Sequence, residues 1–216
     1  TSGTYFFRAR SGAGCWGGEG SAAVTINPLP NLFSVTGGGS YCSGGGGVDI
    51  GLSSTEAGVN YQLFRGATPV GAPVAGTLAA ISFGLQTTAG TYTVVATNPS
   101  TGCFRTMTGS ANVAINPLPT TFTVTAFGPT SYCAGGAGVN LFLLGSASGI
   151  SYQVMLGGLP VGAPVAGTGG FLSLGAFTGS GAHTVIATNT TTGCTNTMTG
   201  SVNITINPLP TAFSVI

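Results

Sequence analysis

Charged side chains are scarce in this chain of 216 residues. Four basic and three acidic residues make up 3% of the sequence, whereas charged residues make up roughly 25% of a typical soluble domain. All four basic residues are arginines, lysine is absent, and His183 is the only histidine. A net charge of +1 provides no basic surface that could neutralise phosphates, which excludes nucleic acid as an expected partner.

Long hydrophobic runs are also missing. Hydrophobic residues make up 43% of the chain, yet Gly, Pro, Asn and Thr interrupt every run. No window approaches the roughly 20 continuous apolar residues that a membrane-spanning helix requires. We therefore expect no membrane span.

Groups that carry out acid–base or metal chemistry are equally rare. The only carboxylate side chains are Glu19, Asp49 and Glu56, too few and too scattered for paired catalytic acids or calcium sites. The glycine runs at 37–39 and 44–47 lack the lysine and the following helix of a phosphate-binding loop. The sequence predicts no enzyme activity, no catalytic or metal-binding residues and no cofactor.

The chain does contain an internal repeat. The segment Ile-Asn-Pro-Leu-Pro occurs at 26–30, 115–119 and 206–210, with spacings of 89 and 91 residues (115 − 26 and 206 − 115). Such a period indicates a repeat protein. We therefore predict four parts, namely the C-terminal part of a preceding repeat at 1–30, complete repeats at 31–119 and 120–210, and the first strand of a following repeat at 211–216.

Each repeat shows the alternation of β-strands and no helical period. Tyr92, Val94 and Ala96, for example, share one face of a segment whose other face carries threonines at 91, 93 and 97. About seven short strands in roughly 90 residues are typical of a two-sheet sandwich. We predict an all-β fold of tandem immunoglobulin-like β-sandwich repeats, with a first core of Phe33, Val35, Ile50, Leu52, Tyr61, Ile81, Phe83 and Val94.

The prolines of the repeated segment end the last strand of each repeat. Proline lacks an amide donor and biases the residue before it toward extended conformations, so Asn-Pro-Leu-Pro predicts a short, stiff connector. Such connectors favour a rod over a flexible string of beads. The predicted linker residues are Pro28, Pro30, Pro117, Pro119, Pro208 and Pro210.

The five cysteines follow the repeat. Cys42 and Cys103 are 61 residues apart (103 − 42), as are Cys133 and Cys194 (194 − 133), and Cys15 matches Cys103 and Cys194 in register. This spacing predicts disulfides 42–103 and 133–194, with the partner of Cys15 outside the sequence. A metal site is the competing interpretation, but there is no Cys-x-x-Cys motif. Disulfides indicate an oxidising, extracellular compartment.

Four motifs together resemble those of a known family. They are Tyr-Cys-x-Gly-Gly-x-Gly-Val, Pro-Val-Gly-Ala-Pro-Val-Ala-Gly-Thr, Tyr-Thr-Val-Val-Ala-Thr-Asn with Thr-Gly-Cys, and Ile-Asn-Pro-Leu-Pro. The combination resembles the tandem immunoglobulin-like repeats of large Bacteroidota cell-surface proteins, which are adhesin-like and secreted by the type IX route. The resemblance covers essentially the whole chain. It implies a cell-surface location and a structural role as a stalk, adhesin or fibre, with no catalytic residues.

Two other functions are consistent with the sequence. Neutral faces rich in Thr, Ser and Gly favour packing on copies of the same chain, which would form a self-assembling filament, joined through strand complementation. A glycan-binding module is the more distant alternative, with Trp16 as its ligand contact, and two or more exposed aromatics in one row would favour it. A loop residue packed beside the disulfide is the simpler interpretation of Trp16. The expected partners are copies of itself or neighbouring repeats, with surface glycans as the alternative.

His183 is the only conventional general base of the sequence. In register it replaces Tyr92 of the first complete repeat and Tyr5 of the opening segment. Immunoglobulin-like sandwiches place a structural tyrosine near this point. We therefore expect His183 to have a structural role.

Overall fold

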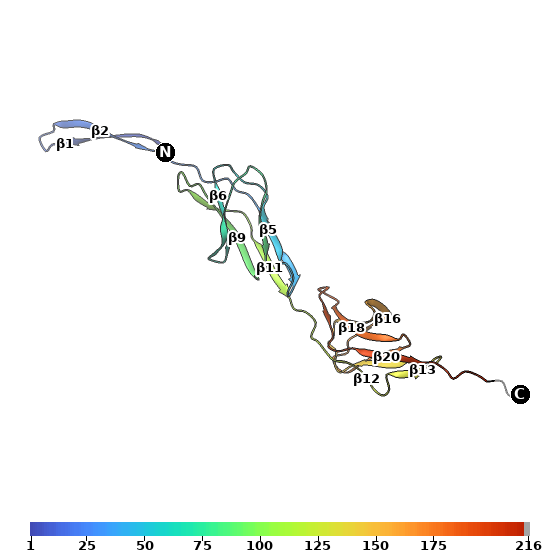
Figure 1. Cartoon of the computed structure of the whole chain (residues 1–216). Helices are drawn as coiled ribbons and strands as arrows, with labels where there is room; N and C mark the ends of the chain where they lie inside the picture. Colours follow the sequence, from blue (N-terminus) through green and yellow to red (C-terminus); the bar gives the residue numbers. More distant parts are fainter. Residues whose placement is uncertain (214–216) are drawn as a thin grey trace. The chain divides into compact units, whose positions relative to one another are not determined.

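The computed structural model describes residues 1–213, and every regular element in this range is a β-strand. The predicted all-β sandwich fold is confirmed. The strands form one hairpin and two sandwiches, each sandwich with a six-stranded and a three-stranded sheet (Figure 1). The chain divides into two compact units, residues 1–41 with 46–114 and residues 42–45 with 115–216. Residues 214–216 of the predicted strand at 211–216 lie outside the described part.

A helix that could cross a membrane is not found anywhere in residues 1–213.

The first sandwich has more and shorter strands than the seven or so expected from the sequence. Its larger sheet has the order β4 (Gly39–Cys42), β11 (Ala111–Asn116), β9 (Gly90–Thr97), β6 (Asn60–Arg65) and β7 (Thr68–Ala75), with β10 (Phe104–Thr106) also on β9. Its smaller sheet has the order β3 (Val35–Gly37), β5 (Val48–Leu52) and β8 (Ile81–Gln86).

A glycine step explains one of the extra strands. The chain leaves the smaller sheet after β3 and enters the larger sheet at β4, with Gly38 between them. Gly38 has a φ of 80°, and a Cβ there would lie 2.8 Å from the carbonyl oxygen of Asn112. Only glycine accommodates both the left-handed backbone and this close approach.

The core of the first sandwich matches the sequence prediction. Tyr61 and Tyr92 are its largest buried side chains. The hydroxyl of Tyr61 accepts a hydrogen bond from the Glu56 backbone N–H (2.8 Å), and that of Tyr92 donates to the Thr88 carbonyl (2.7 Å). Of the predicted core residues, four are buried and four are partly buried against them: Ile50, Leu52, Tyr61 and Val94, and then Phe33, Val35, Ile81 and Phe83.

The buried hydroxyl of Tyr61 makes the first sandwich sensitive to alkaline pH. Burial raises the pKa of Tyr61, because it disfavours the phenolate; the hydrogen bond from Glu56 opposes the rise and the Glu56 carboxylate adds to it. The unfolded chain therefore loses this proton first, at a pKa of about 10. We expect the contribution of Tyr61 to stability to be constant below this pH and to be lost progressively above it. Urea unfolding of the wild-type and Tyr61→Phe chains between about pH 8 and 11 checks this, since the substitution should flatten the decline; parallel declines would contradict it.

The second sandwich repeats the arrangement of the first. Its larger sheet has the order β13 (Ser131–Cys133), β20 (Val202–Asn207), β18 (Gly181–Asn189), β15 (Ile150–Leu156) and β16 (Leu159–Ala166), with β19 (Thr195–Thr197) also on β18. Its smaller sheet has the order β12 (Val124–Ala126), β14 (Val139–Leu143) and β17 (Leu172–Phe177). Tyr152 is fully buried at its centre, and its hydroxyl accepts a hydrogen bond from the Ala147 backbone N–H (2.9 Å).

The N-terminal segment forms a two-stranded hairpin, β1 (Gly3–Arg10) and β2 (Trp16–Val24). Its register, with Tyr5 opposite Ala22, is the register of Tyr92 opposite Ala111 in the β9–β11 pair. Within residues 1–213 neither strand pairs with any other, and only Gly20 of their residues is not exposed. The hairpin thus pairs as β9 and β11 do at the end of a repeat. The face that is buried in β9 is exposed in β1.

Candidate functional site: disulfide, connectors and aromatic surfaces

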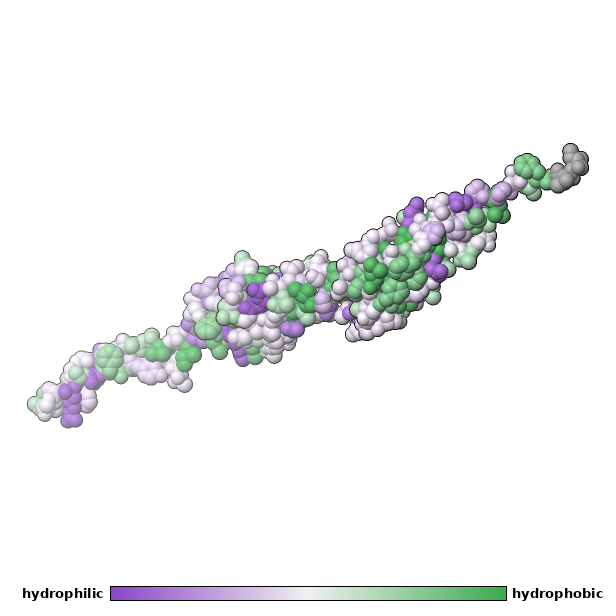
Figure 2. All heavy atoms as spheres, turned by 90° about the horizontal axis from the view of Figure 1, so that it is seen from below, coloured by the Kyte–Doolittle hydropathy of each residue, from purple (hydrophilic) through white to green (hydrophobic). Residues whose placement is uncertain are grey.

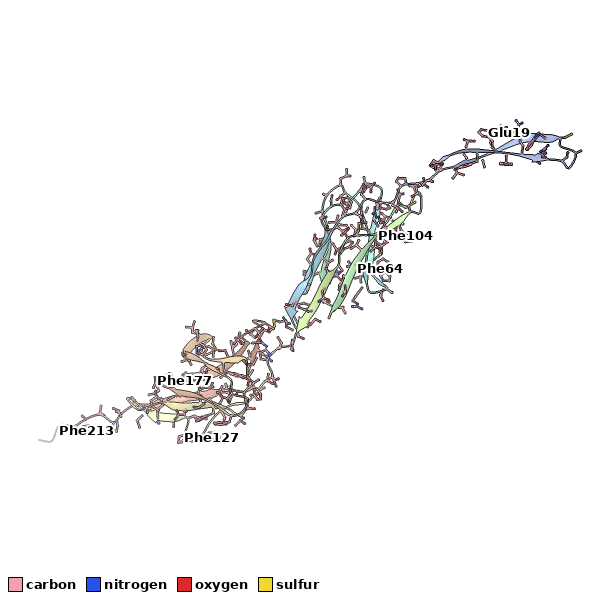
Figure 3. The ribbon with its side chains drawn as sticks, turned by 180° about the vertical axis from the view of Figure 1, so that it is seen from behind. Glu19, Phe64, Phe104, Phe127, Phe177 and Phe213 are labelled. Atoms are coloured by element: carbon pink, nitrogen blue, oxygen red, sulfur yellow. A yellow bond between two sulfur atoms is a disulfide. The ribbon has the colours of Figure 1, made fainter. Side chains whose placement is uncertain are left out.

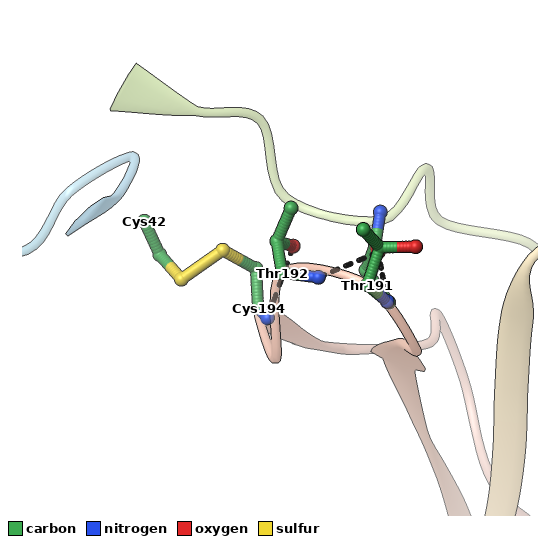
Figure 4. Close-up of a disulfide and its surroundings, with 5 residues drawn as sticks. Cys42, Thr191, Thr192 and Cys194 are labelled. Atoms are coloured by element: carbon green, nitrogen blue, oxygen red, sulfur yellow. Dashed lines mark hydrogen bonds between the residues drawn. A yellow bond between two sulfur atoms is a disulfide. The ribbon is translucent and has the colours of Figure 1, made fainter. Parts of the chain in front are cut away.

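A single disulfide joins Cys42, at the end of β4, to Cys194, in the loop between β18 and β19 (Figure 4). The two Cα atoms are 5.6 Å apart, and 152 residues separate them in sequence. Cys15, Cys103 and Cys133 are free thiols in the described part of the chain. The predicted pairs 42–103 and 133–194 are therefore wrong. The bond connects a cysteine of one repeat with a cysteine of the next.

The topology of the sandwich explains this correction. Cys42 lies where the chain leaves the sandwich, because the next residue, Ser43, donates its backbone N–H to the carbonyl of Asn116 after the end of β11 (2.9 Å). Cys103 follows β9, which runs antiparallel to β11, and its Sγ lies 3.9 Å from the Asn27 carbonyl in the entering connector. The two cysteines thus occupy opposite ends of eight-residue strand β9, roughly 25 Å apart, far beyond disulfide reach.

Local hydrogen bonds hold the Cys194 loop in shape. The side-chain oxygen of Asn189 accepts from the backbone N–H groups of the two threonines that follow Thr190, at 2.9 and 3.1 Å (Figure 4). The Asn189 N–H donates to the carbonyl of Cys194 at 2.8 Å. Asn98 and Cys103 form the same turn in the first repeat. The loop that carries the late cysteine of each repeat is therefore held by hydrogen bonds within the loop itself.

The connector prolines divide into two kinds. Pro30 and Pro119 are buried, and their carbonyls accept from Arg105 (3.4 Å) and Asn196 (2.8 Å), which occupy one position of the repeat. The second proline of each connector is thus anchored on the sandwich that follows it. Pro210, the third member of this set, is exposed. The first prolines of the connectors are all exposed: Pro28, Pro117 and Pro208.

Trp16 occupies a different setting from the one expected. It begins strand β2, its side chain is 62% exposed, and the neighbouring Cys15 is not in a disulfide. Trp16 is therefore a strand residue and not the loop residue of the simpler interpretation, while a disulfide of Cys15 with a cysteine outside the sequence stays a prediction. The guanidinium of Arg10 lies 5.4 Å from the centre of the indole ring, a cation–π distance. One face of the indole is thus already occupied by a side chain of the same hairpin.

His183 is fully buried in the second sandwich, opposite Val202. Its Nδ1 lies 3.0 Å from the Gly181 carbonyl, and within the described residues its Nε2 has no partner. Histidine is shorter than the tyrosine of the first repeat, and Gly179 stands where Thr88 receives the tyrosine hydroxyl. A cavity of about 280 Å³ lies beside the imidazole, lined by Gly179 among others. Of the described residues that line this cavity, His183 is the only one with an ionisable side chain.

Each of the three carboxylates has a local partner. Glu19 forms an ion pair with Arg8 across the hairpin (2.8 Å). Asp49 accepts a hydrogen bond from the Ser82 hydroxyl on the neighbouring strand. Glu56 accepts from the backbone N–H of Asn31 (3.0 Å). Among residues 1–213, no three His, Cys, Asp or Glu side chains are grouped so as to hold a metal ion.

An aromatic cluster was not found from the sequence. Phe127, Phe142 and Phe171 lie within 5.2 to 5.8 Å of one another, measured between ring centroids. Phe127 and Phe171 are more than half exposed. The three residues are far apart in sequence, and only a comparison of the two repeats at equal register could have indicated them.

No protein-family model matches the chain, and no curated protein matches it. Solved structures similar to it include the fibronectin(III)-like modules of Clostridium thermocellum CbhA, with 17% identity, 85% of this chain and 100% of that chain covered, and a TM-score of 0.40. The immunoglobulin domains 1–4 of Sidekick-1 show 15% identity over 95% of this chain and 66% of that chain, with a TM-score of 0.28. The human OSCAR ligand-binding domain shows 15% identity, 82% and 100% coverage, and a TM-score of 0.33.

The class of protein follows from the sheets themselves. Two sandwiches with the same strand order and equivalent registers stand in one chain. The chain is thus an all-β protein of tandem immunoglobulin-like sandwiches. Its disulfide is compatible with an extracellular location.

Proposed function

We propose that this chain is a segment of a rigid extracellular stalk or fibre, built from immunoglobulin-like repeats in series. This is the role implied by the resemblance to large Bacteroidota surface proteins. Its units are the repeats at 31–119 and 120–210, with 1–30 and 211–216 as parts of neighbouring repeats. The observation that carries the proposal is the N-terminal hairpin. Its strands pair in the register of β9 and β11 of the complete repeat, but the face that is buried in β9 is exposed in β1.

The apolar face of the hairpin supports a continued array. Tyr92 and Val94 of β9 are 1% and 0% exposed, whereas Tyr5 and Phe7, at the same positions of β1, are 50% and 62% exposed. Burying one such side chain contributes roughly 1.5–3 kcal/mol. The free edge of β1 corresponds to the edge of β9 that pairs with β6. Both features favour docking of the remaining strands of a repeat.

The C-terminal segment supports the same proposal. Phe33 and Phe122 follow the connectors of the two sandwiches and pack, partly buried, against their cores. Phe213 has the same place after the third connector and is 89% exposed (Figure 3). Pro210 is exposed where Pro30 and Pro119 are buried. Phe213 and Pro210 thus match the residues that begin a sandwich, but within residues 1–213 they are exposed and pack against no core.

The disulfide gives the array a second covalent path beside the connector. Cys133 has the register of Cys42, and Cys15 and Cys103 have the register of Cys194. We propose that the early cysteine of each repeat bonds to the late cysteine of the next. Each bond forms by thiol–disulfide exchange with an extracytoplasmic disulfide oxidant, which takes up two electrons while two thiol protons are released. A connector that is cut or pulled then leaves consecutive repeats attached.

Electron microscopy of the native extracellular material, averaged along any fibre, tests the proposed role. We expect linear assemblies in which sandwich-sized units follow one another. Isolated strands rooted in cells would identify a stalk, and a regular helical stacking of units would identify a self-assembling filament. Compact particles with no longitudinal continuation would contradict both.

A self-assembling filament is the second candidate, because the uncovered hairpin could also be completed by another copy. The two candidates differ in the source of the missing strands. The mass of the reduced and denatured native chain distinguishes them: a chain near 21.0 kDa requires completion by copies, and a much larger chain indicates covalently contiguous repeats.

A further inference from the structure

Three phenylalanines form an exposed cluster on the outer face of the β12–β14–β17 sheet. The ring of Phe171 is stacked on those of Phe127 and Phe142, with interplanar angles of 30° and 27°. The inner face of the same sheet carries Leu141 and Leu143, both 0% exposed, so the sandwich core is complete without the rings. Figure 2 shows a broad hydrophobic area on the unit toward the C-terminal end of the chain.

The first repeat lacks this cluster. Phe142 lies opposite Thr125 and Ser173, and in the first repeat Gly51 lies opposite the equivalent threonine and serine. Phe171 directly precedes β17 as Ala80 precedes β8. By the same alignment, Phe127 after β12 replaces Gly38 after β3. A sandwich of the same strand order therefore forms without aromatic rings at these positions.

The surroundings of the cluster carry no charge. Residues 120–213 contain no Asp, Glu, Lys or Arg, and their one histidine, His183, is fully buried. An ionic ligand would find no complementary group on this repeat. A second copy of the same surface would meet no like-charge repulsion, which is what normally keeps soluble domains apart. Aromatic enrichment with depletion of charge is the composition of homodimer interface cores.

The choice of phenylalanine argues for an apolar partner over a sugar. Tyrosine and tryptophan combine an apolar body with an O–H or N–H group, whereas phenylalanine has no polar atom. Sugar hydroxyls placed on these rings would lose hydrogen bonds to water and gain none from the rings. The rings of another cluster, in contrast, provide stacking partners of the same kind.

We propose that the Phe127–Phe142–Phe171 cluster is a self-association surface, which binds the same cluster of a second copy of this chain. The contact is isologous, so it closes as a pair and joins two arrays side by side. It is independent of the end-to-end continuation and of the disulfide proposed above.

Sedimentation of the 216-residue chain over a range of concentrations tests this proposal. We expect the wild-type chain to pass from 21.0 kDa to twice that mass. The triple variant Phe127→Ala, Phe142→Ala, Phe171→Ala should raise the dissociation constant at least about tenfold. Phe104→Ala is the matched control, because Phe104 is 68% exposed in the first repeat and stands outside the cluster (Figure 3). It should leave the dissociation constant unchanged.

The controls separate association from folding. The triple variant should still fold and melt cooperatively, because the first repeat folds without aromatic rings at the same positions. Phe127→Glu provides a second variant, in which one charge placed in the uncharged contact should abolish pairing without altering the fold. A wild-type chain that stays monomeric up to millimolar concentration, or a triple variant that associates as strongly, would overturn the proposal. So would a monomer that binds insoluble cellulose or chitin through these rings.

Discussion

Replacing Cys42 by serine is expected to raise the number of free thiols in the oxidised chain from three to four. It should also destabilise the oxidised chain by up to about 5 kcal/mol, because the bond closes a loop of 152 residues and limits the entropy of the unfolded state. Thiol titration of the denatured, unreduced protein measures the first effect, and urea unfolding of the second sandwich measures the second. In the reduced state the two chains should be equally stable.

Cys133→Ser is the matched control, because Cys133 has the register of Cys42 but is free. It should lower the thiol count from three to two and leave stability unchanged. Bonds within each repeat would give different numbers, since only Cys15 would then be free in the wild type and either substitution would expose one more thiol. The counts therefore decide between the two pairings without a structure.

The fold was predictable because its information is local. Tyr92, Val94 and Ala96 stand at alternate positions of the sequence, and in the structure all three are buried in the core. The tyrosine side chains that organise the two cores could also be identified, since they recur at equal register. The predicted number of strands, about seven per repeat, was too low. One reason is that the chain changes sheets at Gly38, and the sequence on either side of this glycine does not show that two strands meet there.

The disulfide was not predictable from spacing. Equal separations show that Cys42 and Cys133 occupy equivalent positions, but they do not show at which end of a sandwich those positions lie. The strand after Gly38 runs beside β11, which places Cys42 where the chain exits, and Cys103 lies where it enters. Pairing therefore depends on topology, which the sequence specifies only through contacts between distant strands.

The phenylalanine cluster was missed for a related reason. Only Phe142 lies in a strand, whereas Phe127 follows β12 and Phe171 precedes β17, so strand alternation does not indicate that the three rings meet. The signal lies in the difference between repeats, where Gly51 of the first corresponds to Phe142 of the second. Positions at which otherwise matching repeats exchange a small residue for a large exposed one are candidates for function, because the core does not require the larger residue.

Tyr92→Ala is expected to lower the unfolding free energy of the first sandwich by about 3–5 kcal/mol. The side chain is 1% exposed, and its hydroxyl donates to the Thr88 carbonyl at 2.7 Å. The substitution therefore leaves a cavity of nearly a whole ring and an unpaired carbonyl. Circular dichroism during urea unfolding should show an earlier transition for the first sandwich and an unchanged one for the second.

Tyr5→Ala is the control that connects this prediction to the proposed array. Tyr5 occupies the same register as Tyr92 but is 50% exposed in the 216-residue chain, so its loss there should change stability by no more than about 0.5 kcal/mol. In native fibres the same substitution should approach the cost of Tyr92→Ala, because the hairpin would then be part of a complete core. Fibres with Tyr5→Ala should accordingly lose resistance to urea and proteases at that repeat. If they resist as well as wild-type fibres, the hairpin does not complete a repeat, and the array must continue through other contacts.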